Sequence, residues 1–569
     1  MRNAFSLFKN QKRMSSHSSG HSTNSPGLNR SYHTNCNSND DWFRYTRGRF
    51  LFNEAQEMSI RYVNFNMNEL IKRATESVGL TSAQCSRVEK FPDGMFNKTF
   101  LFTMHDGTQV VGKVPNPNAG RAYYTTASEV ATMDFARNEL CTPVPKVLAW
   151  SSKAEDNTVG AEYIIMEKVA GVQLSKVWPT MGFKERFELV KTISTYQKAW
   201  MAIPFTHYGS LYYSSDMEDS DGCDLVKGVL SIPKHHRFAV GPSTGREFLD
   251  DGRIALDLDR GPWNTVEQYK SAVGLREIAC VQNMTRLPRS QLSLYGPGTY
   301  CSSRSKKIAA LQGYLRLVKY LLPTDPSITS AFLWHPDLHA ENIFVHPERP
   351  AEVLGIIDWQ SSELLPLFDH ARQPDFLDYD GPPSTGIDPP VFPDGFDRLD
   401  PAEKAEAQDL YLKMSLSALY RRFTYSNNIT LFKAMEFRQT TSFEMMLLAQ
   451  NLLIDGEALY RSRCLDLKEE WTALPGVQAS GNAPFPLLFS ADEVASINED
   501  ASGAIRGMEL MQSLRQSLGP MWPEKGVVRP EQYDEVKKLL QQAKAELIDQ
   551  LAYSETEMAA WEEAWPFDS

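Results

Sequence analysis

The chain of 569 residues is 42% hydrophobic and carries a formal net charge of −12 at pH 7, so it can bury large cores, most simply as two lobes with appended helices. Its acidity argues against a nucleic-acid binder, because such a protein needs a basic face. No apolar run approaches the roughly 20 residues that span a bilayer, and the seven scattered cysteines, none in a Cys-x-x-Cys pair, indicate reduced thiols.

The first forty residues differ in composition from everything that follows. Residues 1–39 contain five basic residues and no acidic one, and serine, asparagine and histidine dominate residues 15–39. Such a segment, without a long apolar stretch, is typical of a mitochondrial transit peptide rather than a secretion signal. We therefore expect residues 1–40 to be a mitochondrial transit or disordered segment, and a plain disordered tail is the alternative.

Three β-strands are expected next, over residues 86–90, 99–104 and 109–114. Alternating β-rich runs on either side of an Asp-Gly turn favour hairpins. Gly94 and Asn97 lie in the first hairpin, where backbone N–H groups could cover phosphates. Neither a G-x-G-x-x-G loop nor a P-loop occurs, so the dinucleotide and P-loop classes lose their main support.

Lys113 ends the third of these strands, inside an apolar run where an unpaired ammonium is costly. Glu129, in the predicted helix 128–135, is its natural partner. A strand lysine paired with a helix glutamate holds the ATP phosphates in protein kinases. An exposed edge lysine and a solvated glutamate are the alternative.

Residues 163–171 form a predicted buried strand that runs into a short connector. In a two-lobed kinase this connector is the hinge, and the backbone around Met166, Glu167 and Val169 would bind the adenine edge. A core strand that simply ends at Gly171 is the alternative. We place an N-terminal lobe over residues 41–168, with a preceding helical segment, and a helical C-terminal lobe over residues 169–569, with an insertion near 203–305 and a C-terminal helical extension.

The most informative motif is His335-Pro336-Asp337 with Asn342 five residues after the aspartate, followed by a strand that ends at Asp358. Asp337 could accept the proton of an attacking hydroxyl, while Asn342 and Asp358 could hold Mg²⁺, which prefers oxygen ligands. Turn-capping roles for these polar residues are the alternative. A zinc hydrolase built on His335 and His339 is disfavoured, since a proline separates them and the H-E-x-x-H glutamate is missing.

In their order along the chain and in their residue types, these motifs resemble those of the aminoglycoside phosphotransferase superfamily, which has an H-x-D-x-x-x-x-N loop and an I-D-W/F segment. The resemblance implies an α+β, bilobal protein kinase-like fold, with a β-rich N-lobe, a helical C-lobe and ATP with Mg²⁺ as cofactors. Residues 44–50, 128–133, 260–263 and 334–339 resemble, more narrowly, a group of fungal mitochondrial proteins. The loop departs from the usual His-Gly-Asp of antibiotic kinases by its proline, and Asp-Trp-Gln replaces the Asp-Phe-Gly of protein kinases.

The rest of the chain is expected to be mainly helical. Apolar spacing predicts helices over residues 183–201, 402–425, 442–461, 490–518 and 530–552, and a glycine- and proline-rich loop over 381–395. We expect the insertion around residues 203–262 to be irregular. One of its arginines, Arg237, Arg246 or Arg260, is a candidate to hold an anionic substrate, with surface or structural roles as the alternative.

The sequence thus predicts a kinase that transfers the γ-phosphoryl group of ATP to a hydroxyl of a small molecule in mitochondria. The rival interpretation is a pseudokinase that binds nucleotide or acts as a scaffold, because the glycine hairpin is sparse and Pro336 alters the catalytic turn. The sequence indicates a small-molecule acceptor but neither its identity nor any protein partner.

Overall fold

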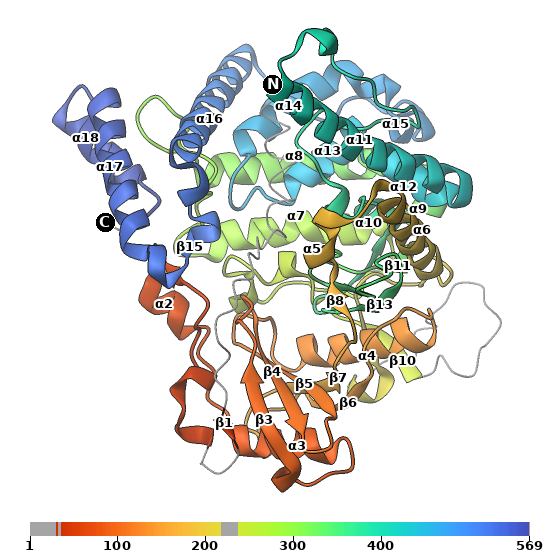
Figure 1. Cartoon of the computed structure of the whole chain (residues 1–569). Coiled ribbons are helices and arrows are strands. Elements are labelled where there is room, and N and C mark those ends of the chain that lie inside the picture. Colours follow the sequence, from red (N-terminus) through yellow and green to blue (C-terminus); the bar gives the residue numbers. More distant parts are fainter. Residues whose placement is uncertain (1–29, 32–35, 218–236, 568–569) are drawn as a thin grey trace.

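The computed structural model describes residues 30–31, 36–217 and 237–567 (Figure 1). The predicted transit segment falls almost wholly outside the described residues. In the described part of the chain, no helix combines the length and the apolarity that crossing a bilayer requires.

The N-lobe is built on a six-stranded antiparallel sheet with the order β1-β3-β4-β5-β7-β6. The central hairpins arise where expected, because β-rich alternating runs flank the turns at residues 91–96 and 105–108. One face of the sheet buries Phe100 and Phe102 against helix α3. The strands and helix are β1 Arg30–Ser31, β3 Cys85–Lys90, β4 Asn97–Met104, β5 Gln109–Pro115, β6 Val147–Ser151, β7 Tyr163–Glu167 and α3 Met67–Glu76.

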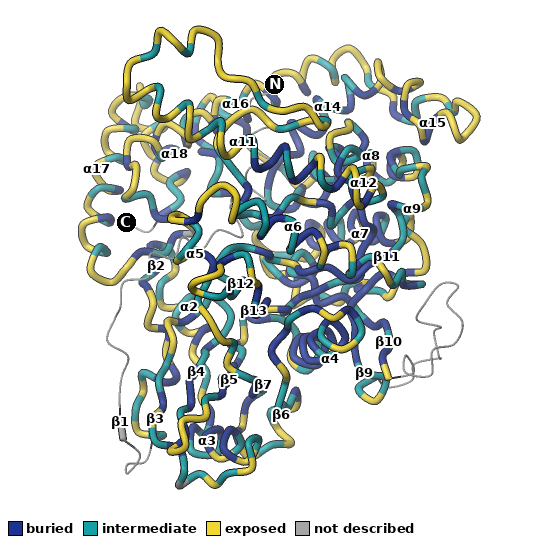
Figure 2. The backbone as a smooth tube through the Cα atoms, turned by 45° about the vertical axis from the view of Figure 1, so that its right-hand side comes forward, coloured by how far each residue is buried: buried dark blue, intermediate teal, exposed yellow. Residues whose placement is uncertain are grey.

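Helix α4 (Tyr124–Asn138) lies between the lobes and is dark blue along nearly its whole length in Figure 2. It contacts β6 and β7 of the N-lobe and β9 of the C-lobe. A helix that is buried on nearly all sides is held in a fixed position. Glu129, which α4 carries, therefore has a fixed position relative to the sheet.

The C-lobe is mainly helical and carries three small sheets around one large apolar core (Figure 1). Its longer helices are α6 Phe183–Trp200, α7 Val266–Asn283, α8 Arg304–Leu321, α11 Pro401–Asn427, α12 Ile429–Phe437, α13 Thr441–Ala449 and α14 Glu457–Glu470, and its short ones α5 Leu174–Val177, α9 Pro326–Thr329, α10 Leu367–His370 and α15 Pro475–Ala479. The small sheets pair β8 (Val172–Gln173), β12 (Ile343–Val345) and β13 (Val353–Ile356), then β11 (Ala331–Leu333) with β14 (Leu364–Pro366), and β9 (Ser210–Tyr213) with β10 (Phe238–Gly241).

A C-terminal extension, which we define as residues 491–567, packs against the C-lobe. It comprises α16 (Ala491–Leu518), β15 (Val527–Val528), α17 (Tyr533–Leu551) and α18 (Glu555–Ala564). Strand β15 pairs with β2 (Arg49–Phe50), which precedes α2 (Glu54–Ser59) near the start of the described chain. Figure 1 shows α2 next to the end of the extension, although these segments lie at opposite ends of the sequence.

Two expectations need correction. The helix predicted over residues 442–461 is two helices, because α13 ends at Ala449 and α14 begins only after Gly456, whose φ of 97° no helix accommodates. The insertion is also less irregular than expected, since it contributes the β9–β10 hairpin. The other four predicted helices are present as α6, α11, α16 and α17, whereas the long helices α7 and α8 were not predicted. Residues 381–395 form the expected loop.

The structure confirms the bilobal, protein kinase-like α+β fold. The β-rich N-lobe and the helical C-lobe meet along β7, α4 and the segment that follows β13. The added helices extend the C-lobe on one side (Figure 1).

Candidate functional site

Three of the predicted site residues meet where the two lobes face each other. The Lys113 ammonium donates to both Glu129 carboxylate oxygens, at 2.7 and 2.9 Å, and to Asp358 Oδ1 at 2.9 Å. Lys113 and Glu129 are buried, whereas the Asp358 side chain is 43% exposed. The predicted Lys113–Glu129 pair is therefore present, and a C-lobe aspartate joins it.

The charges of this cluster fix one another's protonation. Burial alone would lower the pKa of Lys113, but the carboxylates of Asp358 and Glu129 outweigh it and raise that pKa. Desolvation works against ionisation of Asp358, yet the Lys113 ammonium holds the pKa of this carboxyl below its ordinary value. Burial raises the pKa of Glu129, and Lys113 opposes that rise. The site thus presents one fixed cation beside one solvent-facing carboxylate.

The loop from His335 to Asn342 is held by hydrogen bonds between its own members. The Asn342 Nδ2 group donates to the Asp337 carbonyl at 3.0 Å, and the Asn342 carbonyl accepts from the Ile357 N–H at 2.9 Å. Asn342 therefore links the turn of Asp337 to the strand that delivers Asp358. Asp358 itself has a φ of 64°, a left-handed conformation that non-glycine residues rarely adopt and that often marks functional positions.

His335 braces both sides of this loop from within. Its Nδ1 accepts the Asp337 N–H at 3.1 Å, so the proton is on Nε2, which donates to the Ile357 carbonyl at 2.8 Å. Burial lowers the pKa of His335, which keeps the ring neutral and preserves this pattern. His335 is thus a support of the loop.

Only one of the two carboxylate oxygens of Asp337 has a partner among the described residues. Its Oδ2 is 3.3 Å from His339 Nε2, whereas its buried Oδ1 has no hydrogen-bond partner among the described residues. A buried acceptor without a donor is costly and commonly marks the place of a missing ligand. This oxygen is an acceptor to which a bound hydroxyl group could donate.

The first hairpin reaches down to the C-lobe. Asn97 Nδ2 donates to Gln360 Oε1 at 2.6 Å, two residues after Asp358, and Gln360 in turn donates to the Ala119 carbonyl at 3.2 Å. Gly94 is partly exposed in the hairpin turn, where its N–H donates to the Asn97 carbonyl at 3.1 Å. Gln360 was not singled out from the sequence; its position beside the Asp358 segment was the only available signal.

The predicted hinge residues, at the connector between the lobes, differ from one another in burial and in hydrogen bonding. Met166 is buried in β7, and the Glu167 N–H donates to the Lys146 carbonyl at 2.9 Å, so this N–H is used within the sheet. Val169 is partly exposed, and its side chain lies over Gly355, where any larger residue would collide with it. The connector therefore rests directly on strand β13, which leads to Asp358.

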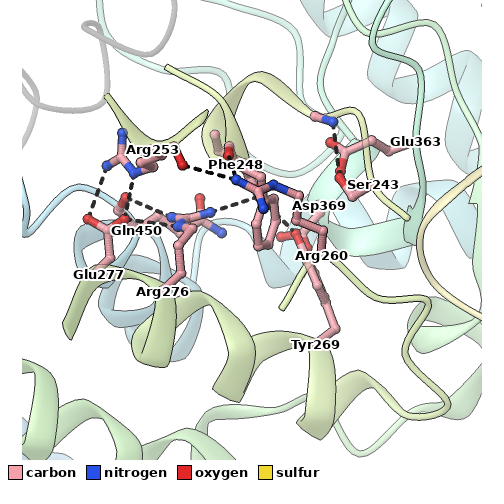
Figure 3. A network of polar contacts seen from close by, with 12 residues as sticks. Ser243, Phe248, Arg253, Arg260, Tyr269, Arg276, Glu277, Glu363, Asp369 and Gln450 are labelled. Carbon is pink, nitrogen blue, oxygen red and sulfur yellow. Dashed lines mark hydrogen bonds and ion pairs between the residues drawn. The ribbon is translucent and has the colours of Figure 1, made fainter. Parts of the chain in front are cut away.

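The three arginines of the insertion lie in different places. Arg260 is buried and donates to four backbone carbonyls, including those of Arg253 and Leu256, so its proposed role in substrate binding is corrected to a structural one (Figure 3). Arg237 pairs with Asp134 on α4 at 2.6 Å. Arg246 donates to the carbonyls of residues 118 and 119, and its guanidinium lies 3.8 Å from the centre of the Phe96 ring in the hairpin.

The oxygen atoms that the side chains offer at this site suit a hard cation that takes few ligands from the protein. No group of three or more His, Cys, Asp or Glu side chains that could hold a metal occurs in the described ranges. Asn342 and Asp358 offer amide and carboxylate oxygens, and Mg²⁺ usually binds one or two such groups together with water and substrate phosphates. The residues present thus fit Mg²⁺ bound with a nucleotide, and they do not fit a zinc site.

No family model matches the chain. It is 27% identical over 514 residues to an Aspergillus fumigatus protein named subtelomeric hrmA-associated cluster protein, covering 85% of this chain and 97% of that protein. It is 24% identical to the Saccharomyces cerevisiae protein named altered inheritance of mitochondria protein 9, mitochondrial, covering 81% and 83% of the two chains. A crystal structure of a putative aminoglycoside phosphotransferase from Ralstonia eutropha aligns with a TM-score of 0.35 at 16% identity, over 79% of this chain and 99% of that chain. The chain is therefore similar, over about four fifths of its length, to fungal proteins named altered inheritance of mitochondria protein 9.

Proposed function

We propose that the chain is a kinase that transfers the γ-phosphoryl group of ATP to a hydroxyl of a small molecule in mitochondria. The observation that carries the proposal is the convergence of Lys113, Glu129 and Asp358, from a strand, a helix and a segment of the other lobe. Phosphoryl transfer needs mainly positioning and electrostatic stabilisation, and these three charged groups with the Asp337–Asn342 loop are suited to both.

Each residue has a defined part in this scheme. Bound MgATP would supply the phosphoryl group and the cation that screens its charge. Lys113, kept in place by Glu129, would hold phosphate oxygens, and Asn342 and Asp358 would hold the magnesium ion. Asp337 would orient the acceptor hydroxyl and take its proton, because its Oδ1 is a buried acceptor that has no donor within the described residues.

Two further sets of predicted residues would bind the nucleotide: those of the connector would bind the base, and those of the first hairpin would bind the phosphates. The Glu167 carbonyl and the Val169 backbone would face the adenine edge, beside the buried Met166 side chain. The hairpin that contains Gly94 and Asn97 would cover the phosphates, since it is fastened to Gln360 close to Asp358. The mitochondrial location rests on the names of the relatives and on the composition of residues 1–39.

A nucleotide-binding protein without turnover is the second candidate. The Asn97–Gln360 bond favours it, because the hairpin is already held against the C-lobe by the protein's own side chains. In such a pseudokinase the cleft would bind nucleotide or a partner but would not catalyse transfer.

The test begins with thermal unfolding of the purified protein with ATP, in the presence and absence of Mg²⁺. A Mg²⁺-dependent rise of Tm is expected, and its absence would overturn the proposal. Incubation with ³²P-labelled ATP and a mitochondrial metabolite extract should then yield a labelled small molecule. Asp337→Asn is the matched control, because it should retain the Tm shift and lose the product; a shift without product from any extract would favour the pseudokinase.

A further inference from the structure

The hairpin expected to cover the phosphates is held on its outer side by a segment that we call the strap, residues 40–50. The Thr46 N–H and hydroxyl both donate to Asp93 Oδ2, each at 2.9 Å, and the Tyr45 hydroxyl lies 3.8 Å from the Met95 sulfur. Asp93, in the hairpin turn, is only 1% exposed. A buried carboxylate is stable only when it is paired, so these strap contacts fix the turn.

Two lysines complete this anchor. Lys90 Nζ donates to Asp93 Oδ2 at 2.7 Å and also to the strap carbonyls of Asp41 and Arg44, at 2.8 and 2.9 Å. Lys98 Nζ lies 3.6 Å from Asp93 Oδ1. Strands β3 and β4, which flank the turn, are therefore joined through one carboxylate to the backbone of the strap.

The other end of the strap packs against the C-terminal extension. Phe50 and Arg49 pair with Val527 and Val528 in the β2–β15 ladder, and the Arg49 guanidinium lies 3.5 Å from the centre of the Tyr533 ring at the start of α17. Leu51, directly after the strap, is part of the apolar core of the extension. Trp42 and Phe43 near its beginning are part of the N-lobe core.

Arg61 joins the two halves of the strap. Its guanidinium lies 4.5 Å from the centre of the Phe50 ring and 5.9 Å from that of Tyr45, and the side chain is only 3% exposed. Tyr45 contacts the hairpin and Phe50 contacts the extension, so a displacement at one end of the strap is resisted at the other. Packed interiors transmit such displacements because they have little free volume.

The extension in turn is fastened to the C-lobe. Lys306 of α8 donates to Asp500 of α16 at 2.8 Å, and Gly507 of α16 lies so close to Leu294 that no side chain would fit between them. The strap therefore provides a second connection between the lobes, in addition to residues 167–171.

From these contacts we propose that Thr46 and Asp93 are positioning residues of the nucleotide site, and that the strap couples the C-terminal extension to the hairpin at residues 91–97. This inference rests on the proposed function for its effect on nucleotide, because the hairpin matters to ATP only if it covers the phosphates. The coupling itself concerns the mobility of the hairpin and can be measured without any nucleotide.

The experiment is hydrogen–deuterium exchange on the full-length protein. Tyr533→Leu removes the aromatic face under Arg49, far along the chain from the hairpin, and should raise amide exchange in residues 91–97 about fivefold, the effect of one lost cation–π contact. Thr46→Val should do the same locally. Tyr553→Ser, at a side chain of the same extension that is 89% exposed, is the matched control and should change nothing.

A second readout uses the reciprocity of coupled sites. If the hairpin binds MgATP, the nucleotide should lower exchange at residues 526–533, and Tyr533→Leu should weaken MgATP binding about fivefold while turnover at saturation changes little. Unchanged hairpin exchange in Tyr533→Leu, with increased exchange in Thr46→Val, would overturn the coupling. Should Tyr533→Leu unfold the extension, Arg49→Met removes the same contact from the strap side, together with the ion pair of Arg49 with Glu54.

The two proposals fail in different ways. If wild-type protein binds no MgATP but Tyr533→Leu raises amide exchange in the hairpin, the proposed function is wrong and the proposed coupling is supported. If MgATP binds and the hairpin is indifferent to Tyr533, the proposed function stands and the coupling falls.

Discussion

Lys113 and Asp358 are 245 positions apart in the sequence, yet Lys113 Nζ donates to Asp358 Oδ1 at 2.9 Å. This contact joins strand β5 of the N-lobe sheet to the segment that leaves β13 in the C-lobe. Because Glu129 holds Lys113 from the other side, the ammonium has two carboxylate partners from different elements. The candidate site therefore depends on both lobes being in place.

Removing the lysine should destabilise the fold as well as the site. Lys113→Met leaves the Glu129 carboxylate buried without its partner, and the free energy of unfolding should fall by about 3–5 kcal/mol. The double variant Lys113→Met/Glu129→Leu removes the stranded charge and should recover most of that loss. Urea denaturation measures both, and neither variant should bind MgATP. Equal stability of the single and double variants would show that Glu129 does not depend on Lys113.

Asp358→Ala should abolish the Mg²⁺-dependent part of nucleotide binding. The Asp358 side chain is 43% exposed, so its removal should cost little stability while the cation loses one of its two protein oxygens. Titration of ATP with and without Mg²⁺, followed by thermal unfolding, measures this. Glu352→Ala, at an exposed carboxylate before β13, is the control. A Mg²⁺ effect that survives Asp358→Ala would remove this residue from the metal site.

His335→Ala should lower kcat about a hundredfold, because a displacement of the catalytic group by about 1 Å has an effect of that size. The ring holds the Asp337 N–H and the Ile357 carbonyl at the same time, so both aspartates lose a support. KM for ATP should change less, since Lys113 and the connector are untouched. His346→Ala is a suitable control, because His346 also accepts a neighbouring N–H but lies at the other end of β12 from Asn342. Steady-state kinetics on an identified acceptor decides the outcome.

The contribution of Lys98 to the free energy of unfolding should increase with pH in the alkaline range. Burial lowers the pKa of Lys98 from 10.5 to about 8, so the unfolded chain binds this proton more tightly than the folded one. The free energy of unfolding therefore gains on the order of 3 kcal/mol from this group as the pH rises from 8 to 10.5. Lys98→Met should be more stable than the wild type at pH 7 and should lack this increase.

Urea denaturation of the two proteins between pH 7 and pH 10 separates this contribution from other titrating groups. The difference between wild type and Lys98→Met should shrink steadily as the pH rises. A constant difference across this range would mean that Lys98 is not buried as a cation in solution.

The site could be predicted largely because its parts lie in a fixed order. The strand lysine, the helix glutamate and the Asp337–Asn342 loop are each recognisable locally, and the fold brings Lys113 and Glu129 together as expected. The roles of these residues in catalysis stay predictions. The contact of Asn97 with Gln360 was not predictable, because a single amide–amide bond across the lobes leaves no periodic pattern.

The strap was missed for a related physical reason. Its strand β2 has two residues, and so does β15, and such short runs carry too little alternation to be recognised. The break between α13 and α14 was missed because an isolated glycine is tolerated in a helical pattern, whereas here Asp455 binds the Tyr295 hydroxyl at 2.7 Å and Gly456 turns the chain.

The β2–β15 ladder has a consequence for how the protein is made. Strand β2 leaves the ribosome long before β15, its partner, which follows the whole C-lobe in the sequence. Until β15 is made, the N-lobe can form its sheet, but the strap that holds its hairpin has no partner strand. Completion of the site should therefore await the synthesis of β15, and a chain terminated before β15 would contain the whole Asp337–Asn342 loop without the support that β15 gives to the strap.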